Sequence, residues 1–242
     1  MNILIKKIKY KLNFIVKYLN PPFSSMSKSD YYKAIPKSLY FNLKYFSIRE
    51  AIRLPILISH HVKLKRLKGK IILENARFGG VKIGFGELSG FNKEDSKAVI
   101  DITGRIIFRG SAFIGNGNRF QIKGTLILGK NVSIVADNII RAINKICIGD
   151  NCVIGFTNLF MDSDFHKIYN LEDNKTINEN DKIVIGTHVW ITSRCTILKK
   201  TKIGNDCIVG SNTLLNNEII RNNVIIAGNP GKVCKDRISW EK

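Results

Sequence analysis

The chain has 242 residues, of which 44% are hydrophobic and 24% are charged. These proportions fit one large soluble domain with a small appendage, and they exclude a disordered or collagen-like chain. The 39 lysines and arginines against 19 acidic residues give a net charge of +20 at pH 7, which ordinarily raises nucleic acid as a partner. Lysine is abundant along the whole chain rather than in one block, so the charge alone does not establish that partner.

The five cysteines are odd in number, show no C-x-x-C spacing and follow no cleavable secretory signal. No disulfide framework or zinc site is therefore predicted, and a reducing cytoplasm is the expected location. Lysines interrupt the only early apolar stretch, so no segment is expected to span a bilayer as a helix.

Residues 1–20 place apolar side chains at helical spacing, with lysines on the remaining arc, until Pro21 ends the pattern. A basic amphipathic helix of this kind either lies on an anionic membrane surface or packs on the protein or a neighbouring subunit. Residues 23–61 read as a mixed helical segment broken at Pro36 and Pro55. We therefore expect an N-terminal segment over residues 1–61.

From about Val62 to residue 228 the helical periodicity is replaced by aliphatic residues at a spacing of six. The register is clearest late in the chain, at Ile185, Ile191, Ile197, Ile203, Val209 and Leu215. An earlier run keeps the same step at Ile122, Leu128, Ile134 and Ile140, and after a slip of two residues it continues at Ile148 and Ile154. An internal repeat this short predicts a solenoid.

In such a solenoid each hexapeptide forms one short strand and a corner, and three of them close a triangular coil. Coils of about eighteen residues allow six or seven of them. The residue four places after each aliphatic one is also expected to face inward, and it is small or modest at Val132, Cys152, Val189, Cys195, Thr201, Cys207 and Thr213. The three cysteines in this set are predicted to fill the core rather than to act as nucleophiles.

Two motifs carry a family resemblance. The stretch IGTHVWITSRCTILKKTKIGNDCIVGSN (Ile185 to Asn212) is similar to an I-G-x-x-V-W-I-G pattern, and AGNPGKVCKD (Ala227 to Asp236) is similar to an A-G-x-P-A-K/R ending. With these motifs the chain resembles the hexapeptide-repeat acyltransferases. The resemblance implies an all-β solenoid, a left-handed parallel β-helix, over residues 62–228 with a basic tail at 229–242. It also implies acetyl-CoA as co-substrate and no metal.

A polar insertion at residues 161–182 breaks the repeat, and extruded loops on solenoids commonly carry function. Its D-x-D-F-H-x-I sequence resembles the surface-polysaccharide and sugar O-acetyltransferase branch, which implies that His166 is the general base. Either Asp164 or Asp162 is expected to hold the other ring nitrogen, and the spacing does not choose between them. The alternative is that His166 is a solvated loop residue.

The resemblance also assigns the acyl-CoA site. It places the backbone N–H of Ser193 at the oxyanion of the tetrahedral intermediate. The residues implied to contact the co-substrate are Trp190, Thr192, Ser193, Ser211, Asn229, Lys232 and Lys235. Thr192 stands where most members of the family carry glycine, and a purely structural role for Trp190 stays open.

The expected function is transfer of an acetyl group from acetyl-CoA to a sugar hydroxyl in a surface polysaccharide, such as capsule or O-antigen, by a homotrimer. N-acetylation of a nucleotide-linked amino sugar and a non-catalytic scaffold are the alternatives. A zinc enzyme on the same solenoid needs three histidine ligands, and only His166 and His188 lie in the repeat region, where His188 is expected to be a solvated surface residue. Nucleic acid is disfavoured because the aromatic residues, ten of which lie in the first fifty positions, form no stacking motif.

Overall fold

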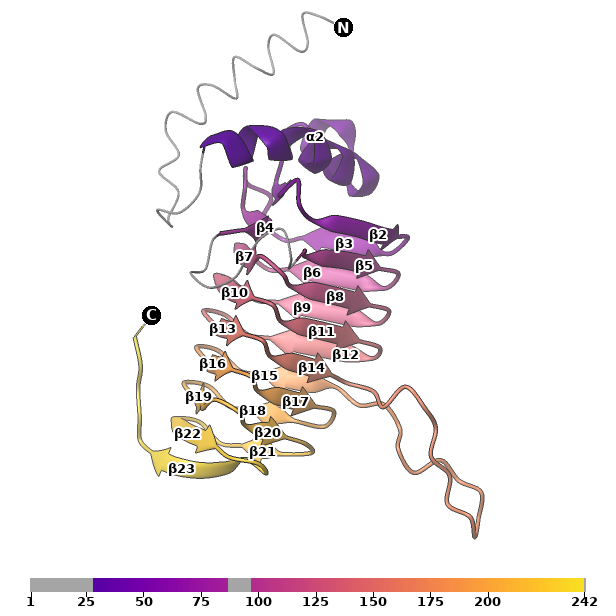
Figure 1. Cartoon of the computed structure of the whole chain (residues 1–242), viewed down its shortest axis with the longest axis vertical. Helices are drawn as coiled ribbons and strands as arrows, with labels where there is room; N and C mark the ends of the chain where they lie inside the picture. Colours follow the sequence, from indigo (N-terminus) through magenta and orange to yellow (C-terminus); the bar gives the residue numbers. More distant parts are fainter. Residues whose placement is uncertain (1–27, 87–96, 242) are drawn as a thin grey trace, which may run out of the picture.

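The computed structural model of the protein describes residues 28–86 and 97–241. The described chain forms a triangular solenoid with a helical cap at its N-terminal end (Figure 1). The amphipathic helix predicted for residues 1–20 lies outside the described residues.

The cap consists of α2 (Lys28–Tyr45) and the short α3 (Ile48–Ala51). Pro36 was expected to break the segment, but α2 continues through it. Packing holds the turns beyond it, because the buried side chains of Ser38 and Asn42 bond to the edge of the first strand. The N–H of Ile58 donates to Ser38 Oγ at 2.8 Å, and Asn42 Nδ2 donates to the carbonyl of Ile56 at 2.7 Å. The helix thereby covers a strand edge that would otherwise be unpaired.

The solenoid has three sheets whose strands recur every third element. The first sheet contains β1 (Ile56–Ile58), β4 (Val81–Phe85), β7 (Ala112–Gly115), β10 (Val132–Ala136), β13 (Val153–Phe156), β16 (Trp190–Ser193), β19 (Ile208–Val209), β22 (Val224–Ala227) and β23 (Lys232–Asp236). The second contains β2 (Lys63–Leu67), β5 (Val99–Ile102), β8 (Arg119–Ile122), β11 (Ile139–Ala142), β14 (Leu159–Met161), β17 (Thr196–Leu198) and β20 (Leu214–Leu215). The third contains β3 (Lys70–Leu73), β6 (Arg105–Phe108), β9 (Thr125–Leu128), β12 (Lys145–Ile148), β15 (Ile183–Ile185), β18 (Lys202–Ile203) and β21 (Ile219–Ile220).

The strands pair in parallel within each sheet, except that β23 turns back and pairs antiparallel with β22. Seven strands in each of the second and third sheets correspond to seven coils, within the predicted range. The first strand, β1, lies before the repeat that is visible in the sequence. All three of its residues are buried, so no alternation of apolar and polar residues marks it as a strand. The domain division expected from the sequence stays a prediction.

Coil length differs from the expected eighteen residues in the first half of the solenoid. There Thr125 pairs with Lys145 and Ser133 with Val153, which makes these coils twenty residues long. The two additional residues lie at the corner between the second and third sheets. Five residues separate Arg141 from Cys147 there, but only three separate the positions in register with them, Leu198 and Lys202. They account for the slip in the sequence register. In the later coils the coil length shortens to eighteen residues, as the pairing of Trp190 with Ile208 shows.

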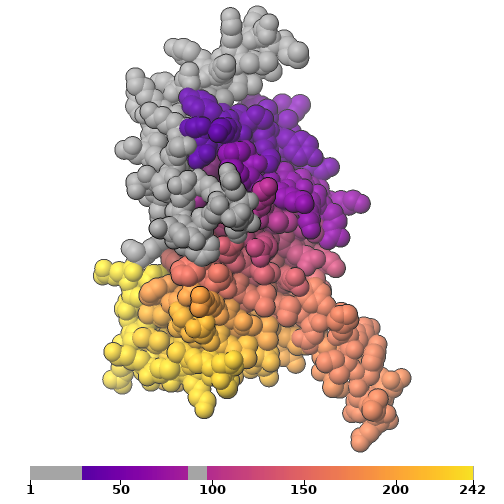
Figure 2. All heavy atoms as spheres, viewed as in Figure 1, coloured from indigo at the N-terminus to yellow at the C-terminus, as the bar shows by residue number. Residues whose placement is uncertain are grey.

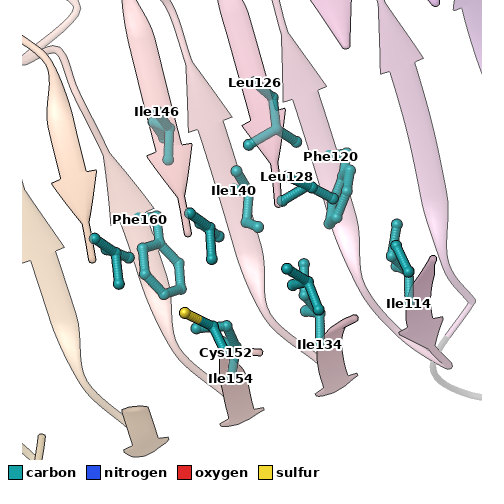
Figure 3. Close-up of a cluster of buried hydrophobic side chains, with 14 of the residues drawn as sticks. Ile114, Phe120, Leu126, Leu128, Ile134, Ile140, Ile146, Cys152, Ile154 and Phe160 are labelled. Atoms are coloured by element: carbon teal, nitrogen blue, oxygen red, sulfur yellow. The ribbon is translucent and has the colours of Figure 1, made fainter. Parts of the chain in front are cut away.

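The core is a continuous column of aliphatic and aromatic side chains inside the coils. Figure 3 shows part of it, with Ile114, Ile134 and Ile154 stacked from successive strands of the first sheet. The small inward positions named above are all buried, as predicted. Burial also raises the pKa of the Cys195 and Cys207 thiols, which disfavours the reactive thiolate.

Candidate functional site

The inserted loop leaves the solenoid between β14 and β15, at the corner between the second and third sheets. Its outer part is a hairpin in which Tyr169 bridges Thr176 in antiparallel fashion, and the N–H of Ile177 donates to the carbonyl of Ile168 at 2.9 Å. Figures 1 and 2 show the loop standing clear of the body of the molecule. This interruption of the repeat is therefore a projecting structure.

Asp162 fixes the root of this loop to the preceding coil. Its fully buried carboxylate accepts the backbone N–H groups of Ile143 at 2.7 Å and Asn144 at 3.0 Å. Burial raises the pKa of the Asp162 carboxyl, although these two hydrogen bonds favour its charged form. Asp162 thus serves as an anchor in this structure.

Asp164 joins the loop to the following coil. Its carboxylate accepts Lys199 Nζ at 2.5 Å and Asn178 Nδ2 at 2.9 Å. The hydrogen bond from Lys199 holds the pKa of the Asp164 carboxyl below its usual value. Lys199 also donates to the carbonyl of Asn178 at 3.0 Å, so one lysine ties together both ends of the loop.

His166 lies on the exposed part of the loop, and its backbone is held on both sides. Its N–H donates to the carbonyl of Asp164 at 2.8 Å, and its carbonyl accepts Asn178 Nδ2 at 2.7 Å. Within the described residues, no hydrogen bond joins the carboxylate of Asp162 or Asp164 to the imidazole of His166. The catalytic role of His166, and the expected support from either carboxylate, stay predictions.

Three hydroxyl groups from neighbouring coils meet where β16 and β19 end, at the corner between the first and second sheets. Ser211 Oγ lies 3.2 Å from Thr192 Oγ1 and 3.1 Å from Ser193 Oγ, and Thr192 Oγ1 also donates to the carbonyl of Val209 at 2.8 Å. Ser193 and Ser211, eighteen positions apart in the chain, are thereby brought together. We call Thr192, Ser193 and Ser211 the hydroxyl cluster.

The hydroxyl cluster and His166 occupy different corners of the same chain. Ser193 is at the corner between the first and second sheets, whereas Asp164 beside His166 is bonded to Lys199 at the next corner. One side of the triangle separates them, and six extended residues span about 20 Å. The described part of one chain therefore does not bring His166 and Ser193 together.

Trp190 begins β16 on the outer face of the first sheet and is 38% exposed. Its ring centroid lies 5.8 Å from that of Trp240, which arrives from the C-terminal tail. Trp240 stacks on the ring of His188 at 4.3 Å, and its Nε1 donates to the carbonyl of His188 at 2.9 Å. Asp206 Oδ1 lies 2.8 Å from His188 Nδ1. His188 is thus part of an ordered cluster. The sequence predicts a solvated surface residue at this position, and the structure differs because Trp240 covers the ring.

The C-terminal tail lies along the outside of the last coils. Asn229 and Pro230 are joined by a cis peptide bond after β22, and β23 then places Lys232 opposite Ala227 and Lys235 opposite Ile225. Both lysines are exposed. The tail is held further on by an ion pair between Arg221 and Asp236.

Within the described residues no group of three histidine, cysteine or acidic side chains is arranged to hold a metal. None of the described helices is long and apolar enough to cross a membrane.

The chain is similar to several known proteins. The chain is 35% identical over 120 residues to the polysialic acid O-acetyltransferase of Neisseria meningitidis, an alignment that covers 50% of this chain and 54% of the relative. This chain thus spans about half the length of that curated relative. It is 29% identical over 188 residues to an uncharacterised 24.8 kDa protein in the cps region of Klebsiella pneumoniae, covering 77% of this chain and 81% of the relative. No family model matches the chain.

Among solved structures, a hexapeptide transferase family protein from Anaplasma phagocytophilum superposes with a TM-score of 0.50 at 12% identity, covering 73% of this chain and 84% of the other. The left-handed parallel β-helix fold expected from the sequence is confirmed by this likeness, and the resemblance to hexapeptide-repeat acetyltransferases is confirmed by the relatives.

Proposed function

We propose that this chain is an acetyl-CoA-dependent O-acetyltransferase that acts on a sugar hydroxyl of a surface polysaccharide. The observation that carries the proposal is the projecting loop, which presents His166 in the open while fixing its backbone through Asp164, Asn178 and Lys199. A base that must reach a hydroxyl on a large acceptor needs this combination of exposure and fixed position. The relative named as a polysialic acid O-acetyltransferase supports the same class of acceptor.

The surface around the hydroxyl cluster is chemically suited to acetyl-CoA as co-substrate. The side chains of Thr192, Ser193 and Ser211 offer neutral polar groups for the amides of a pantetheine arm. Lys232 and Lys235 are exposed cations that suit nucleotide phosphates. Asn229 and Trp190 complete the set assigned to the co-substrate.

The proposed reaction is a direct acyl transfer. The imidazole of His166 accepts the proton of the sugar hydroxyl while that oxygen attacks the thioester carbonyl carbon. The N–H of Ser193 donates to the oxyanion that forms. When the intermediate collapses, the carbon–sulfur bond breaks and the imidazolium returns the proton to the leaving thiolate, which yields an acetyl ester and free CoA.

Asp164 assists in this scheme by holding the loop that carries His166. Lys199 lowers the pKa of the carboxyl, so Asp164 is ionised at neutral pH two positions from His166. Because this carboxylate is ion-paired with Lys199, it fixes the loop to the following coil and limits the positions that the His166 imidazole can take.

The proposed assembly is a homotrimer in which His166 of one subunit meets the hydroxyl cluster of the next. The separation of these groups within one chain supports a shared site. The loop also exposes large apolar side chains, including Leu171 at 98% and Ile177 at 62%, and exposed apolar groups of this kind favour contact with another protein surface. Light scattering at micromolar concentration is expected to give three times the mass of the chain. A monomer would contradict the shared site.

The proposed location is the cytoplasm, at the inner face of the cytoplasmic membrane. The lysine-rich sequence of residues 1–20 supports this placement because basic amphipathic segments bind anionic lipid. Deleting residues 1–20 is expected to move the protein from the membrane to the soluble fraction. An unchanged distribution at low salt would refute the membrane contact.

The experiment that tests the function is release of thiol from acetyl-CoA against a panel of sugar acceptors. Wild type is expected to release thiol only when an acceptor is present, and His166→Ala is expected to lower turnover by roughly 100- to 10,000-fold. His61→Ala, a histidine outside the projecting loop, is the matched control and is expected to keep wild-type turnover. Equal turnover in His166→Ala and wild type would remove His166 from the role of base.

A further inference from the structure

A basic pocket lies on the one edge of the solenoid that the proposed site does not use. Its cavity of about 250 Å³ is lined by Asn75, Arg77, Arg109, Gly110, Ser111 and Lys130. These residues occupy the corners between the third and first sheets in three successive coils. The projecting loop and the hydroxyl cluster lie at the other two corners.

The three cations of the pocket, Arg77, Arg109 and Lys130, form few ion pairs within the described residues. Arg109 Nε approaches Glu74 Oε1 only to 3.8 Å, beyond hydrogen-bond distance. No carboxylate of the described chain lies within ion-pair distance of the Arg77 or Lys130 side chain. Lys82, on the adjoining strand, adds further positive charge, and burial together with the nearby Arg77 lowers its pKa. Asp150, at the same corner of the next coil, accepts the backbone N–H of Lys130 at 2.7 Å. With Glu74 and Asp150 against Arg77, Lys82, Arg109 and Lys130, the region of the pocket keeps a net positive charge.

The packing of the coils brings these cations close together. Adjacent strands are about 4.8 Å apart, so the three corners span about 10 Å. Gly110 allows its coil to lie close to Lys130 of the next coil. A Cβ at position 110 would lie 2.9 Å from Lys130 Cγ and 3.0 Å from Lys130 Cα. Like charges in neighbouring coils repel each other, and an anion bound between them offsets that repulsion.

We propose that this pocket binds an anionic group of the acceptor glycan, so that the acceptor is an acidic rather than a neutral polysaccharide. This inference rests on the proposed function for the identity of the ligand as a glycan. The guanidinium groups of Arg77 and Arg109 match the planar geometry of a carboxylate, and Lys130 supplies a further point charge. Asn75 and Ser111 supply neutral groups that pair with sugar hydroxyls.

The size and place of the pocket fit a distal contact on a long chain. A cavity of about 250 Å³ is smaller than the 300–1,000 Å³ typical of sites that enclose a complete drug-sized ligand. It accommodates one charged unit of a polymer, while another unit presents its hydroxyl at a different edge. Holding a polymer at two places raises the effective concentration of the reacting unit.

Binding without acetyl-CoA tests the proposal separately from catalysis. The probes are a hexamer of α2,8-linked sialic acid, a hexamer of galacturonic acid, the carboxyl-reduced form of each, and inorganic phosphate. The full-length wild type is compared by calorimetry with the triple variant Arg77→Gln, Arg109→Gln, Lys130→Gln. The charge-matched control is Lys70→Gln, Arg105→Gln, Lys145→Gln, which removes three cations from exposed positions on the outer face of the third sheet.

At least one acidic hexamer is expected to bind wild type, and the pocket variant is expected to bind it about tenfold more weakly. The control variant is expected to stay within about threefold of wild type, since its cations contribute only screened, long-range attraction. The carboxyl-reduced hexamers are expected to show no comparable binding. Circular dichroism of both variants establishes that each is folded.

Five results would overturn the proposal: no binding of either acidic hexamer, equal binding of the reduced forms, equal loss in both triple variants, glycan binding by the pocket variant equal to that of wild type, or binding of inorganic phosphate without binding of a glycan. Failure of the proposed function is distinguishable from these. If the pocket variant loses glycan binding while wild type releases no thiol with any acceptor, the pocket stands and the acetyltransferase does not. If wild type releases thiol but the pocket variant binds glycan as well as wild type, only the pocket assignment fails.

Discussion

A ladder of three buried asparagines supports the corner that carries the hydroxyl cluster. Asn118, Asn138 and Asn158 lie at the same position in three successive coils, and each is almost fully buried. Asn138 Nδ2 donates to Asn118 Oδ1 at 2.9 Å and to the carbonyl of Gly155 at 2.9 Å. Asn138 Oδ1 accepts the backbone N–H of Asn158 at 3.0 Å and its Nδ2 at 2.9 Å.

Replacing Asn138 by alanine removes these four hydrogen bonds at once. Each contributes about 1 kcal/mol net, and the backbone N–H of Asn158 is left buried without its acceptor. We therefore expect the free energy of unfolding to fall by about 3–5 kcal/mol. The effect reaches the proposed site, because Asn158 Nδ2 donates to the carbonyl of Thr192 at 3.2 Å and Asn158 Oδ1 accepts the N–H of Cys195 at 2.8 Å.

Urea unfolding followed by circular dichroism measures this loss as a shift in the midpoint at unchanged slope. Asn216→Ala is the matched control, since Asn216 is exposed and its substitution is expected to change stability by less than about 0.5 kcal/mol. An Asn138→Ala protein within about 1 kcal/mol of wild type would refute the reasoning that the ladder holds successive coils together.

Two further predictions concern the tail and an ion pair. Trp240→Ala removes the stacking on His188 and the indole hydrogen bond, so the amide proton of Ile238 is expected to exchange faster with solvent; unchanged exchange by mass spectrometry would show that the tail is held by other contacts. Arg66 donates two hydrogen bonds to the Asp101 carboxylate, at 2.9 and 2.7 Å, and thereby lowers the pKa of that carboxyl. The pair therefore stabilises the protein fully at pH values above the ordinary aspartate pKa of about 3.9. This contribution is lost as the pH falls through the lowered pKa. The difference in urea stability between wild type and Asp101→Asn is therefore expected near neutral pH and to shrink in acid; a difference independent of pH would contradict it.

The solenoid could be predicted because its determinants are local and repeated. Every coil must place an aliphatic residue inside, so the six-residue register of residues such as Ile191 and Ile197 is visible in the sequence and both are fully buried. The twenty-residue coils were missed because the extra residues fall at corners. The recurrence of asparagine at positions 118, 138 and 158 was a visible sign of that length.

The site was only partly predictable, because its contacts are not local. The loop and its histidine are marked by the break in the repeat, but the partner of Asp164 is Lys199, thirty-five positions away. Nothing in the local pattern indicates that Trp240 returns along the edge to His188. The sequence pointed to Ser193 and Ser211 only by resemblance, and the eighteen-residue step of the later coils explains why they meet.

The most direct test of the central claim follows the acetyl group itself. Full-length protein is incubated with radiolabelled acetyl-CoA and an acidic polysaccharide, and the polymer is recovered and treated with hydroxylamine, which releases acetyl esters and leaves acetyl amides in place. We predict hydroxylamine-sensitive label on the polymer with wild type, and at most about one-hundredth of that rate with His166→Ala. Label that resists hydroxylamine, or an equal rate in the variant, would contradict an O-acetyltransferase that uses His166 as its base.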